Sequence, residues 1–351
     1  CKVNLTVIPW DKYEETYTTA LNSGEGPDVG YMYNEMFPTY IDAGAVEDMS
    51  SYVTDEDKKE YKYLSNGNMM DGQYGWPLVT GVPFVLYYNE DILNALGEKA
   101  PETWDDFARI CQEATKDTDG DGKVDQYGFA CGMNTSDIGA MQILNAYYYS
   151  ALWQNGGQVY NDDLKSVSFA DEAGKEAVTW LKGLTSYMNE DFMSLSWSDA
   201  FSNVFGAGKA AFGITRSSQT DGTTFTETYP DLNWNFVTSL KNKEFGTFGA
   251  TDCLTLMSAC EDKDLAMDFI KYVTGSEFMT AYHAKCPGAA LTESEPYVGD
   301  EKMEKIYTED KDKWHGIQAG PCGTQILNQL AADFQGIMSG ETSVDEGLKE
   351  A

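Results

Sequence analysis

Apolar residues recur along this chain at two spacings, one typical of amphipathic helices and one typical of half-buried strands. Helical spacing predicts helices over residues 11–21, 89–96 and 265–273, and alternation or short apolar runs predict strands over 2–8, from 29, and over 210–214. Side chains suited to the first turn predict further helix starts at Thr103, Asp171 and Ser343. The two kinds of element alternate, which predicts open α/β sheets with helices on both faces.

An aspartate occupies every second position of the segment DTDGDGKVD, residues 117–125. This is the spacing of an EF-type calcium loop, in which alternate carboxylates curl round a glycine and one backbone carbonyl completes the set. The expected ligands are the side chains of Asp117, Asp119, Asp121 and Asp125 and the backbone carbonyl of Lys123. Position 12 is a glycine where a bidentate Glu belongs, so the loop is either a structural calcium site or an Asp/Gly-rich surface turn.

Aromatic residues beside polar ones form the second candidate site. Trp10 follows the first expected strand, Tyr33 and Glu35 follow the start of the second, and Trp76 sits in the segment Tyr-Gly-Trp-Pro. Flat rings match the apolar faces of sugars, while charged and amide side chains match the hydroxyl rim. Core packing is the alternative for each ring, and we assign Trp104, Trp180 and Trp234 to the core.

Arg216 is one of only two arginines and follows an apolar strand. Its guanidinium suits a pair of hydroxyls or the carboxylate of an acidic sugar. A surface salt bridge is the alternative.

Composition limits the classes of protein to which this chain can belong. The 351 residues carry a formal net charge of −33, which excludes nucleic acid and anionic lipid as partners. The chain is long enough for two domains, and it has no apolar run of 18 residues that would span a membrane. The two histidines lie in no nucleophile or metal motif, so the sequence predicts no enzyme.

Seven cysteines occur at positions without a CxxC spacing, which argues against a zinc ribbon or a thioredoxin-type site. We expect Cys111, Cys131, Cys253 and Cys260 to pack as small apolar side chains. Cys1 is either the lipid-bearing residue of a processed lipoprotein or simply the residue before the first strand.

Sequence blocks in a fixed order carry a family resemblance. The chain resembles the extracellular solute-binding proteins of ABC transporters, in the maltose-binding-like sugar family. The matching blocks are GPDV (26–29), YIDAGAV (40–46), YGWP (74–77), LYYN (86–89), PETWDDF (101–107), QNGG (154–157), GAGKAAF (206–212), AMDFI (266–270) and SGETSVDEGL (339–348).

The resemblance implies a type II periplasmic-binding-protein fold, in which two discontinuous lobes are joined by a three-crossing hinge. The expected N-terminal lobe comprises residues 1–82 and 251–297, and the expected C-terminal lobe comprises 83–250 and 298–351. The expected crossings lie near 81–83, 247–252 and 297–302. Some similar proteins carry a calcium-type loop, which supports the metal.

The resemblance also implies a function, the capture of a sugar, expected to be an oligosaccharide, between closing lobes and its delivery to ABC permease subunits. Ligand contacts in similar proteins imply that the site residues here are Trp10, Tyr33, Glu35, Trp76, Thr80, Tyr147, Tyr149, Arg216 and Asp252. We expect a monomer outside the cytoplasmic membrane, either a cell-surface lipoprotein or a periplasmic protein. The alternatives are a receptor for a peptide or polyamine and a carbohydrate-active enzyme.

Overall fold

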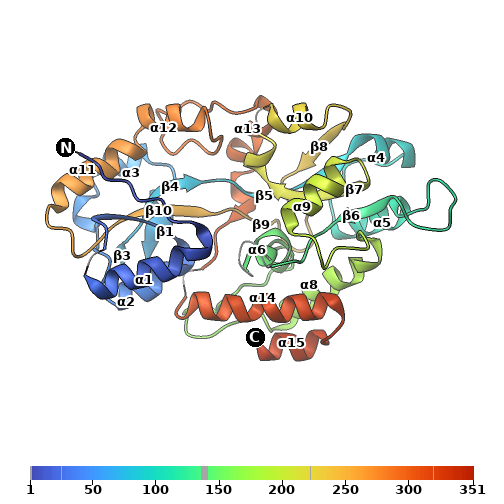
Figure 1. The fold of residues 1–351 in the computed structure, drawn as a ribbon, viewed down its shortest axis with the longest axis horizontal. Coiled ribbons are helices and arrows are strands. Elements are labelled where there is room, and N and C mark those ends of the chain that lie inside the picture. The colour runs from blue at the N-terminus through green and yellow to red at the C-terminus, as the bar shows by residue number, and fades with distance from the viewer. Residues whose placement is uncertain (1, 25, 136–140, 222, 319) are drawn as a thin grey trace.

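Two β-sheets, each surrounded by helices, occupy separate halves of the molecule in the computed structural model (Figure 1). The structure describes residues 2–24, 26–135, 141–221, 223–318 and 320–351. Cys1, and with it the possible lipid attachment, lies outside the described residues.

The sheet of the N-terminal lobe is antiparallel, in the order β1 (Val29–Tyr33), β10 (Thr251–Leu256), β4 (Trp76–Thr80). The sheet of the C-terminal lobe has the order β6 (Tyr127–Ala130), β7 (Ala210–Arg216), β5 (Phe84–Asn89), β8 (Trp234–Val237), and only β6 and β7 are parallel. Two small pairs complete the strands, β2 (Asn68–Met69) with β3 (Gly72–Gln73) and β9 (Thr247–Phe248) with β11 (Trp314–His315).

Helices cover both sheets. Around the first sheet lie α1 (Tyr13–Ser23), α2 (Phe37–Asp42), α3 (Asp57–Glu60), α11 (Lys263–Thr274) and α12 (Ser276–His283). The remaining helices are α4 (Glu90–Leu96), α5 (Trp104–Ala114), α6 (Met141–Ile143), α7 (Tyr149–Gln154), α8 (Glu172–Gly183), α9 (Trp197–Ala200), α10 (Thr224–Thr228), α13 (Glu301–Thr308), α14 (Gly323–Ser339) and α15 (Val344–Glu350). None of the described helices is long and apolar enough to cross a lipid bilayer.

The expected helix starts are confirmed by their caps. Thr103 and Asp106 form a reciprocal capping box at α5, and the side chains of Asp171 and Ser343 accept backbone N–H groups at the starts of α8 and α15. These signals are local, because each cap needs only the first turn of its own helix.

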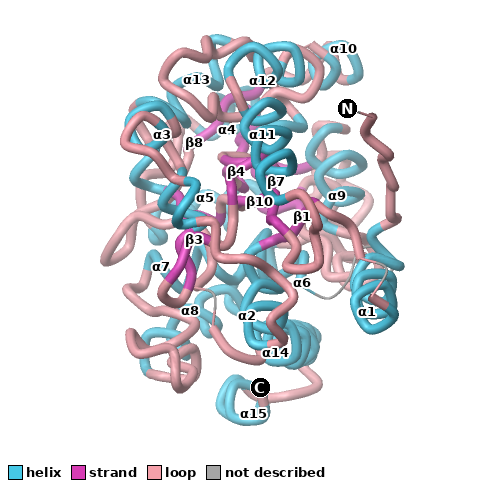
Figure 2. The backbone as a smooth tube through the Cα atoms, turned by 90° about the vertical axis from the view of Figure 1, so that its left-hand side faces the viewer, coloured by secondary structure: helices cyan, strands magenta, loops and turns pink. Residues whose placement is uncertain are grey.

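The expected first strand is wrong. Residues 2–9 form no strand, Leu5 and Val7 are 83% and 81% exposed, and the segment runs as a loop along its length (Figure 2). The outer edge of β1 is already occupied at its centre, because the hydroxyl of Tyr17 accepts the N–H of Tyr31 at 2.9 Å and donates to its carbonyl at 3.0 Å. Side chains of α1 therefore satisfy the backbone groups that another strand would need.

Each lobe has its own apolar core. Trp76 and Leu256 belong to a core of the N-terminal lobe, and Phe107 and Phe212 to one of the C-terminal lobe. The four cysteines expected to pack as small apolar side chains are buried free thiols, as predicted. Trp104 and Trp234 are buried, and Trp180 stacks on Trp104 with ring centroids 4.1 Å apart.

Strand register brings distant residues to neighbouring strand ends. Tyr33 lies opposite Asp252, and Thr251 lies opposite Thr80, so the ends of three strands meet at one edge of the first sheet. In the second sheet Phe84 lies opposite Arg216. The chain passes from β4 to β5 through residues 81–83, so these two sets of strand ends lie on either side of a short crossing. The exact lobe boundaries stay a prediction.

Candidate functional site

A cleft of about 960 Å³ lies where the ends of the two sheets face each other. One wall comes from α1, the end of β1 and the 3₁₀ helix η2 (Asn34–Met36). The opposite wall comes from α6, α9 and the end of β7, and the N-terminal ends of β10 and β5 contribute to the lining. Helix α14 connects the walls, because it contacts both η2 and α6.

Six of the nine sequence-predicted binding residues line this cleft. They are Trp10, Tyr33, Glu35, Thr80, Arg216 and Asp252. The other three, Trp76, Tyr147 and Tyr149, do not line it.

Trp76 is fully buried in the core of the N-terminal lobe, edge-to-face with Tyr61 at a centroid distance of 5.1 Å. Tyr147 and Tyr149 are buried in the core of the C-terminal lobe, where the Tyr147 hydroxyl accepts the N–H of Gly132 at 3.0 Å. Because β4 turns Trp76 toward the helices behind the sheet, we revise its expected role from ligand contact to core packing.

Aromatic rings form the wall of the N-terminal lobe. Trp10, which is 59% exposed, lies 5.3 Å from Tyr13, 6.1 Å from Tyr31 and 6.2 Å from Tyr33, measured between ring centroids. All four line the cleft. The nine predicted residues include Trp10 and Tyr33 but not Tyr13 or Tyr31, although the strand alternation of β1 places Tyr31 and Tyr33 on one face.

Carboxylates lie directly beside these rings. The hydroxyl of Tyr31 donates to Asp252, and the hydroxyl of Tyr33 donates to Glu14. Burial raises the pKa of Asp252 to about 6, although the Tyr31 bond and the charge of Arg216 act in the opposite direction. Burial also raises the pKa of Glu35 to about 7, and the charges of Asp252 and Glu14 add to this.

Arg216 lies in the opposite wall, where two rings and one hydrogen bond hold its guanidinium. Its guanidinium lies 5.5 Å from the ring centroid of Phe84 and 5.2 Å from that of Trp197, and Nη2 donates to Oε1 of Gln142 at 2.8 Å. It does not form the surface salt bridge that was the alternative for it, because it is mostly buried and is among no ion pairs of the described residues. Burial lowers its pKa, and the charge of Asp252 opposes this.

Several polar atoms of the lining have no hydrogen-bond partner among the described residues. They are Oδ1 of Asn34, Oγ1 of Thr80, Oδ1 of Asn145 and Nε1 of Trp197. Thr80, Asn145 and Trp197 are buried, so each unpaired atom carries a desolvation cost that a ligand would relieve. Sequence reasoning missed Asn145 and Trp197, because nothing local separates a cleft-facing tryptophan from one in the core.

His283, the last residue of α12, also lines the cleft. Its Nδ1 lies 2.5 Å from Oε1 of Glu295, whose other oxygen accepts the N–H of Leu291 at 2.7 Å. Its Nε2 lies beside Gly288, since a Cβ on that glycine would be 3.5 Å away, and Gly288 also lines the cleft. The buried carboxylate therefore fixes the orientation of the imidazole.

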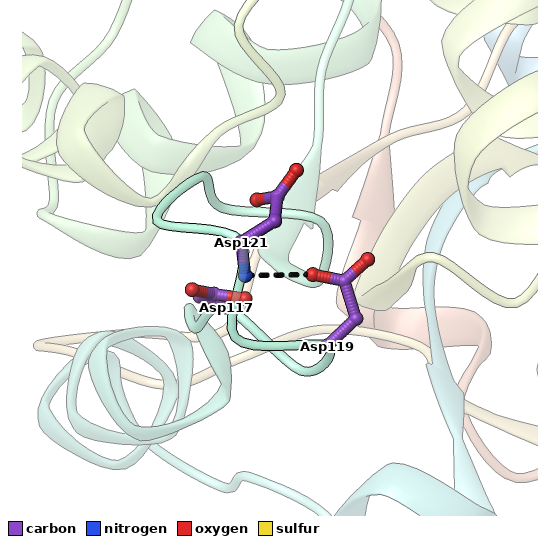
Figure 3. A group of neighbouring side chains, drawn as sticks. All are labelled: Asp117, Asp119 and Asp121. Carbon is purple, nitrogen blue, oxygen red and sulfur yellow. Dashed lines mark hydrogen bonds between the residues drawn. The ribbon is translucent and has the colours of Figure 1, made fainter.

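The aspartate loop connects α5 to β6, and its aspartates do not line the cleft. Ligand oxygens of Asp117, Asp119 and Asp121 lie within 4.8 Å of one another, and all three residues are exposed (Figure 3). The backbone N–H groups of Gly120 and Gly122 donate to Asp117 at 2.6 and 2.7 Å, and these bonds lower its pKa. The three carboxylates thus suit a hard cation such as calcium.

The remaining expected ligands are less well placed. The carboxylate of Asp125 accepts the backbone N–H and the hydroxyl of Thr118 at 2.8 and 2.7 Å. At position 12, a Cβ on Gly128 would lie 2.3 Å from the carbonyl oxygen of Cys111. Packing of β6 on α5 therefore excludes the bidentate glutamate that an EF-type loop would have there.

Comparison with known proteins places the chain in a family. The model of the bacterial extracellular solute-binding proteins matches residues 1–296. A binding protein of Brucella abortus (strain 2308) is 25% identical over 317 residues, which cover 86% of this chain and 69% of that protein.

Solved structures share the fold. A solute-binding protein of an ABC transporter from Thermotoga lettingae, bound to α-D-tagatose, has a TM-score of 0.73 at 18% identity and covers 97% of this chain and 87% of its own. A maltose/maltodextrin-binding domain from Bdellovibrio bacteriovorus, bound to maltotriose, has a TM-score of 0.76 at 14% identity, covering 98% and 88%. The two-lobed type II fold is therefore established, and because the family model spans most of the chain, this protein belongs to the bacterial extracellular solute-binding proteins.

Proposed function

We propose that this protein captures a sugar, and specifically an oligosaccharide, in the cleft between its lobes and delivers it to the permease of an ABC importer. Membership of the family makes it a solute-binding protein and not an enzyme. The observation that carries the sugar assignment is the set of unpaired polar atoms that line the same cleft as a wall of aromatic rings.

Sugar hydroxyls suit these atoms because each hydroxyl both donates and accepts. Trp197 offers a donor, Asn34 and Asn145 offer acceptors, and Thr80 offers both. The rings of Trp10 and Tyr33 match the apolar faces of a pyranose.

The size of the cleft favours several sugar units over one. Its volume of about 960 Å³ lies near the upper end of the usual range for small-molecule sites, roughly 300–1,000 Å³. Of the two solved neighbours described above, one is bound to a monosaccharide and the other to a trisaccharide, so the fold accommodates both.

Capture follows from the position of the cleft between two lobes. A ligand that contacts both walls binds the closed form more tightly than the open form and shifts the population toward it. The permease would then recognise the closed shape.

A thermal-shift screen tests the proposal. Maltotriose, cellotriose, chitotriose, uronate oligomers and the matching monosaccharides are each added at constant calcium. A ligand at a hundred times its Kd stabilises the folded state by ~2.7 kcal/mol, which raises the melting temperature clearly. A selective rise for an oligosaccharide supports the proposal. A flat panel contradicts it and favours a peptide or polyamine as the solute.

For the aspartate loop we propose a structural calcium ion, held by Asp117, Asp119 and Asp121 with the carbonyl of Lys123 and a contribution from Asp125. The carboxylate cluster supports this, and the ion would tie α5 to β6 without touching the cleft. We further propose that the protein acts as a monomer outside the cytoplasmic membrane, anchored through Cys1 or free in the periplasm, in keeping with its extracellular family.

A further inference from the structure

Charged side chains of the cleft are not balanced. The acidic residues that line it are Glu14, Glu15, Glu35 and Asp252, and the basic ones are Arg216, Lys285 and the imidazole of His283. Arg216 and Asp252 attract each other, and Glu15 lies 3.3 Å from Lys12. These pairs account for part of the negative charge but leave the most deeply buried carboxyl unmatched.

Glu35 is that carboxyl. It is buried in η2, which directly follows β1, and its side chain makes no ion pair with any lysine or arginine among the described residues. The titratable groups that influence it from neighbouring elements are Glu14 on α1 and Asp252 on β10, both acidic. Tyr149 and Tyr160 approach it from the other lobe and are neutral phenols.

Aromatic rings line the same cleft as this carboxyl. The ring centroids of Tyr13, Tyr31 and Tyr33 lie 5.3, 6.1 and 6.2 Å from that of Trp10, and the hydroxyls of Tyr31 and Tyr33 donate to carboxylates that line the cleft. Ring faces attract cations, most strongly where water is excluded, and a nearby carboxylate adds direct charge attraction. Rings and carboxylates together are therefore suited to an ammonium group.

We infer that the ligand of this cleft carries a protonated amine, which lies between the aromatic wall and Glu35. The inference rests on the proposed sugar capture and deepens it, because it names an amino-bearing glycan as the ligand class. The unpaired polar atoms of Thr80, Asn145 and Trp197 would bind its hydroxyls, and Glu35 would bind its amine.

Two trisaccharides that differ only in the amine test the inference. Calorimetric titration at pH 7 and physiological salt compares β-1,4-linked glucosamine trimer with its fully N-acetylated counterpart. We expect the free amine to bind at least tenfold more tightly, with one site per chain. In Glu35→Gln the two trimers should bind within twofold of each other.

A matched variant separates the site from the general acidity of the chain. Glu47→Gln removes the same charge from the same lobe, at a residue paired with Lys263 at 2.7 Å outside the cleft. It should keep the tenfold preference. If both variants keep the preference equally, attraction to the net charge of −33 explains it and the inference is overturned.

The remaining outcomes distinguish this inference from sugar capture itself. If the unmodified protein binds the acetylated trimer as tightly as the glucosamine trimer or more tightly, the inference of an amine on the ligand is overturned and the proposal of sugar capture stands. This outcome does not depend on whether the variants fold. If spermidine binds tightly and neither trimer binds, the inference that the ligand carries an amine is supported, and the proposal that the ligand is a sugar is overturned. If neither the glucosamine trimer nor spermidine binds, the inference that the ligand carries an amine is overturned. The panel of neutral sugars then tests the proposal of sugar capture separately.

Discussion

Trp197 illustrates how one side chain can lower the stability of the ligand-free protein and at the same time favour ligand binding. Its ring supports Arg216, while its Nε1 is buried without a partner among the described residues. An unpaired buried donor costs free energy in the free protein, and a ligand acceptor recovers that cost on binding. Trp180 offers a comparison, because its Nε1 is also unpaired but its ring stacks on Trp104 away from the cleft.

Trp197→Phe removes the donor and keeps most of the ring. We expect the variant to bind the sugar selected by the screen about tenfold more weakly, since one hydrogen bond is lost, while its melting temperature stays the same or rises. Trp180→Phe should change stability in the same direction and leave affinity unchanged. Calorimetry and thermal unfolding measure both, and equal affinity of Trp197→Phe and the unmodified protein would remove Trp197 from the site.

Trp76→Ala tests the revised role of Trp76. Removing a fully buried tryptophan leaves a cavity and should cost about 3–5 kcal/mol of unfolding free energy. Affinity of the folded fraction should stay within a factor of two, because the ring does not line the cleft. Urea unfolding and titration check these two points, and a large loss of affinity with little loss of stability would restore the original prediction of a ligand contact.

Glu35 should make stability depend on pH. Its pKa is raised by burial from 4.5 to about 7, so its favourable contribution is full below about pH 4.5 and is lost as the pH rises through 7. Glu35→Gln should therefore gain up to about 3 kcal/mol relative to the unmodified protein between pH 4.5 and 8. Urea unfolding across this range measures the difference, and a constant difference would show that the carboxyl titrates normally.

At the scale of elements, the loop between α5 and β6 combines local signals with a tertiary limit. Gly120 and Gly122 adopt positive φ angles of 81° and 91°, which explains why glycines interrupt the aspartates. Contact between Gly128 and the Cys111 carbonyl removes the last ligand of an EF-type loop. A metal here would have fewer protein ligands and more water than in a complete loop.

Chelation tests the calcium proposal. Excess chelator should lower the melting temperature by several degrees, because an ion that binds only the folded state stabilises it. Asp119→Ala should abolish that response. Asp163→Ala is the control, since Asp163 also accepts a backbone N–H two residues ahead at 3.0 Å but belongs to no carboxylate cluster identified among the described residues. A melting temperature that does not change when chelator is added would contradict the proposal of a bound calcium ion.

For the whole molecule, function depends on the relation between two lobes that share one cleft. To move the open–closed equilibrium from 1:99 to 99:1, a ligand must prefer the closed form by ~5.5 kcal/mol. Contacts to only one wall cannot supply that preference. The cleft offers binding groups on both walls, with Glu35 and Trp10 on one and Asn145 and Trp197 on the other.

Ligand-driven closure should reduce the radius of gyration. Small-angle X-ray scattering with and without saturating sugar measures it, and Trp10→Ala at its own saturating concentration should reach the same closed value. An unchanged radius at full occupancy would mean that the lobes do not close on this ligand.

The sequence by itself determined the features that depend on neighbouring residues. The caps at Thr103, Asp171 and Ser343, the helices that follow them and the aspartate loop were all predicted, because each needs only a few adjacent side chains. Ordered family blocks also predicted the two-lobed fold. Local alternation failed at residues 2–8, because Tyr17 of α1 bonds the backbone of Tyr31, and no pattern within a strand records this.

Only the tertiary structure decided which candidates share the cleft. Tyr33 meets Asp252, and Phe84 meets Arg216, through strand registers between segments far apart in the chain. Trp76 and Trp197 are both buried, yet one packs in the core of the N-terminal lobe and the other lines the cleft. The physical reason is that the orientation of a ring is set by what packs on each face of its element, and those neighbours come from distant parts of the chain.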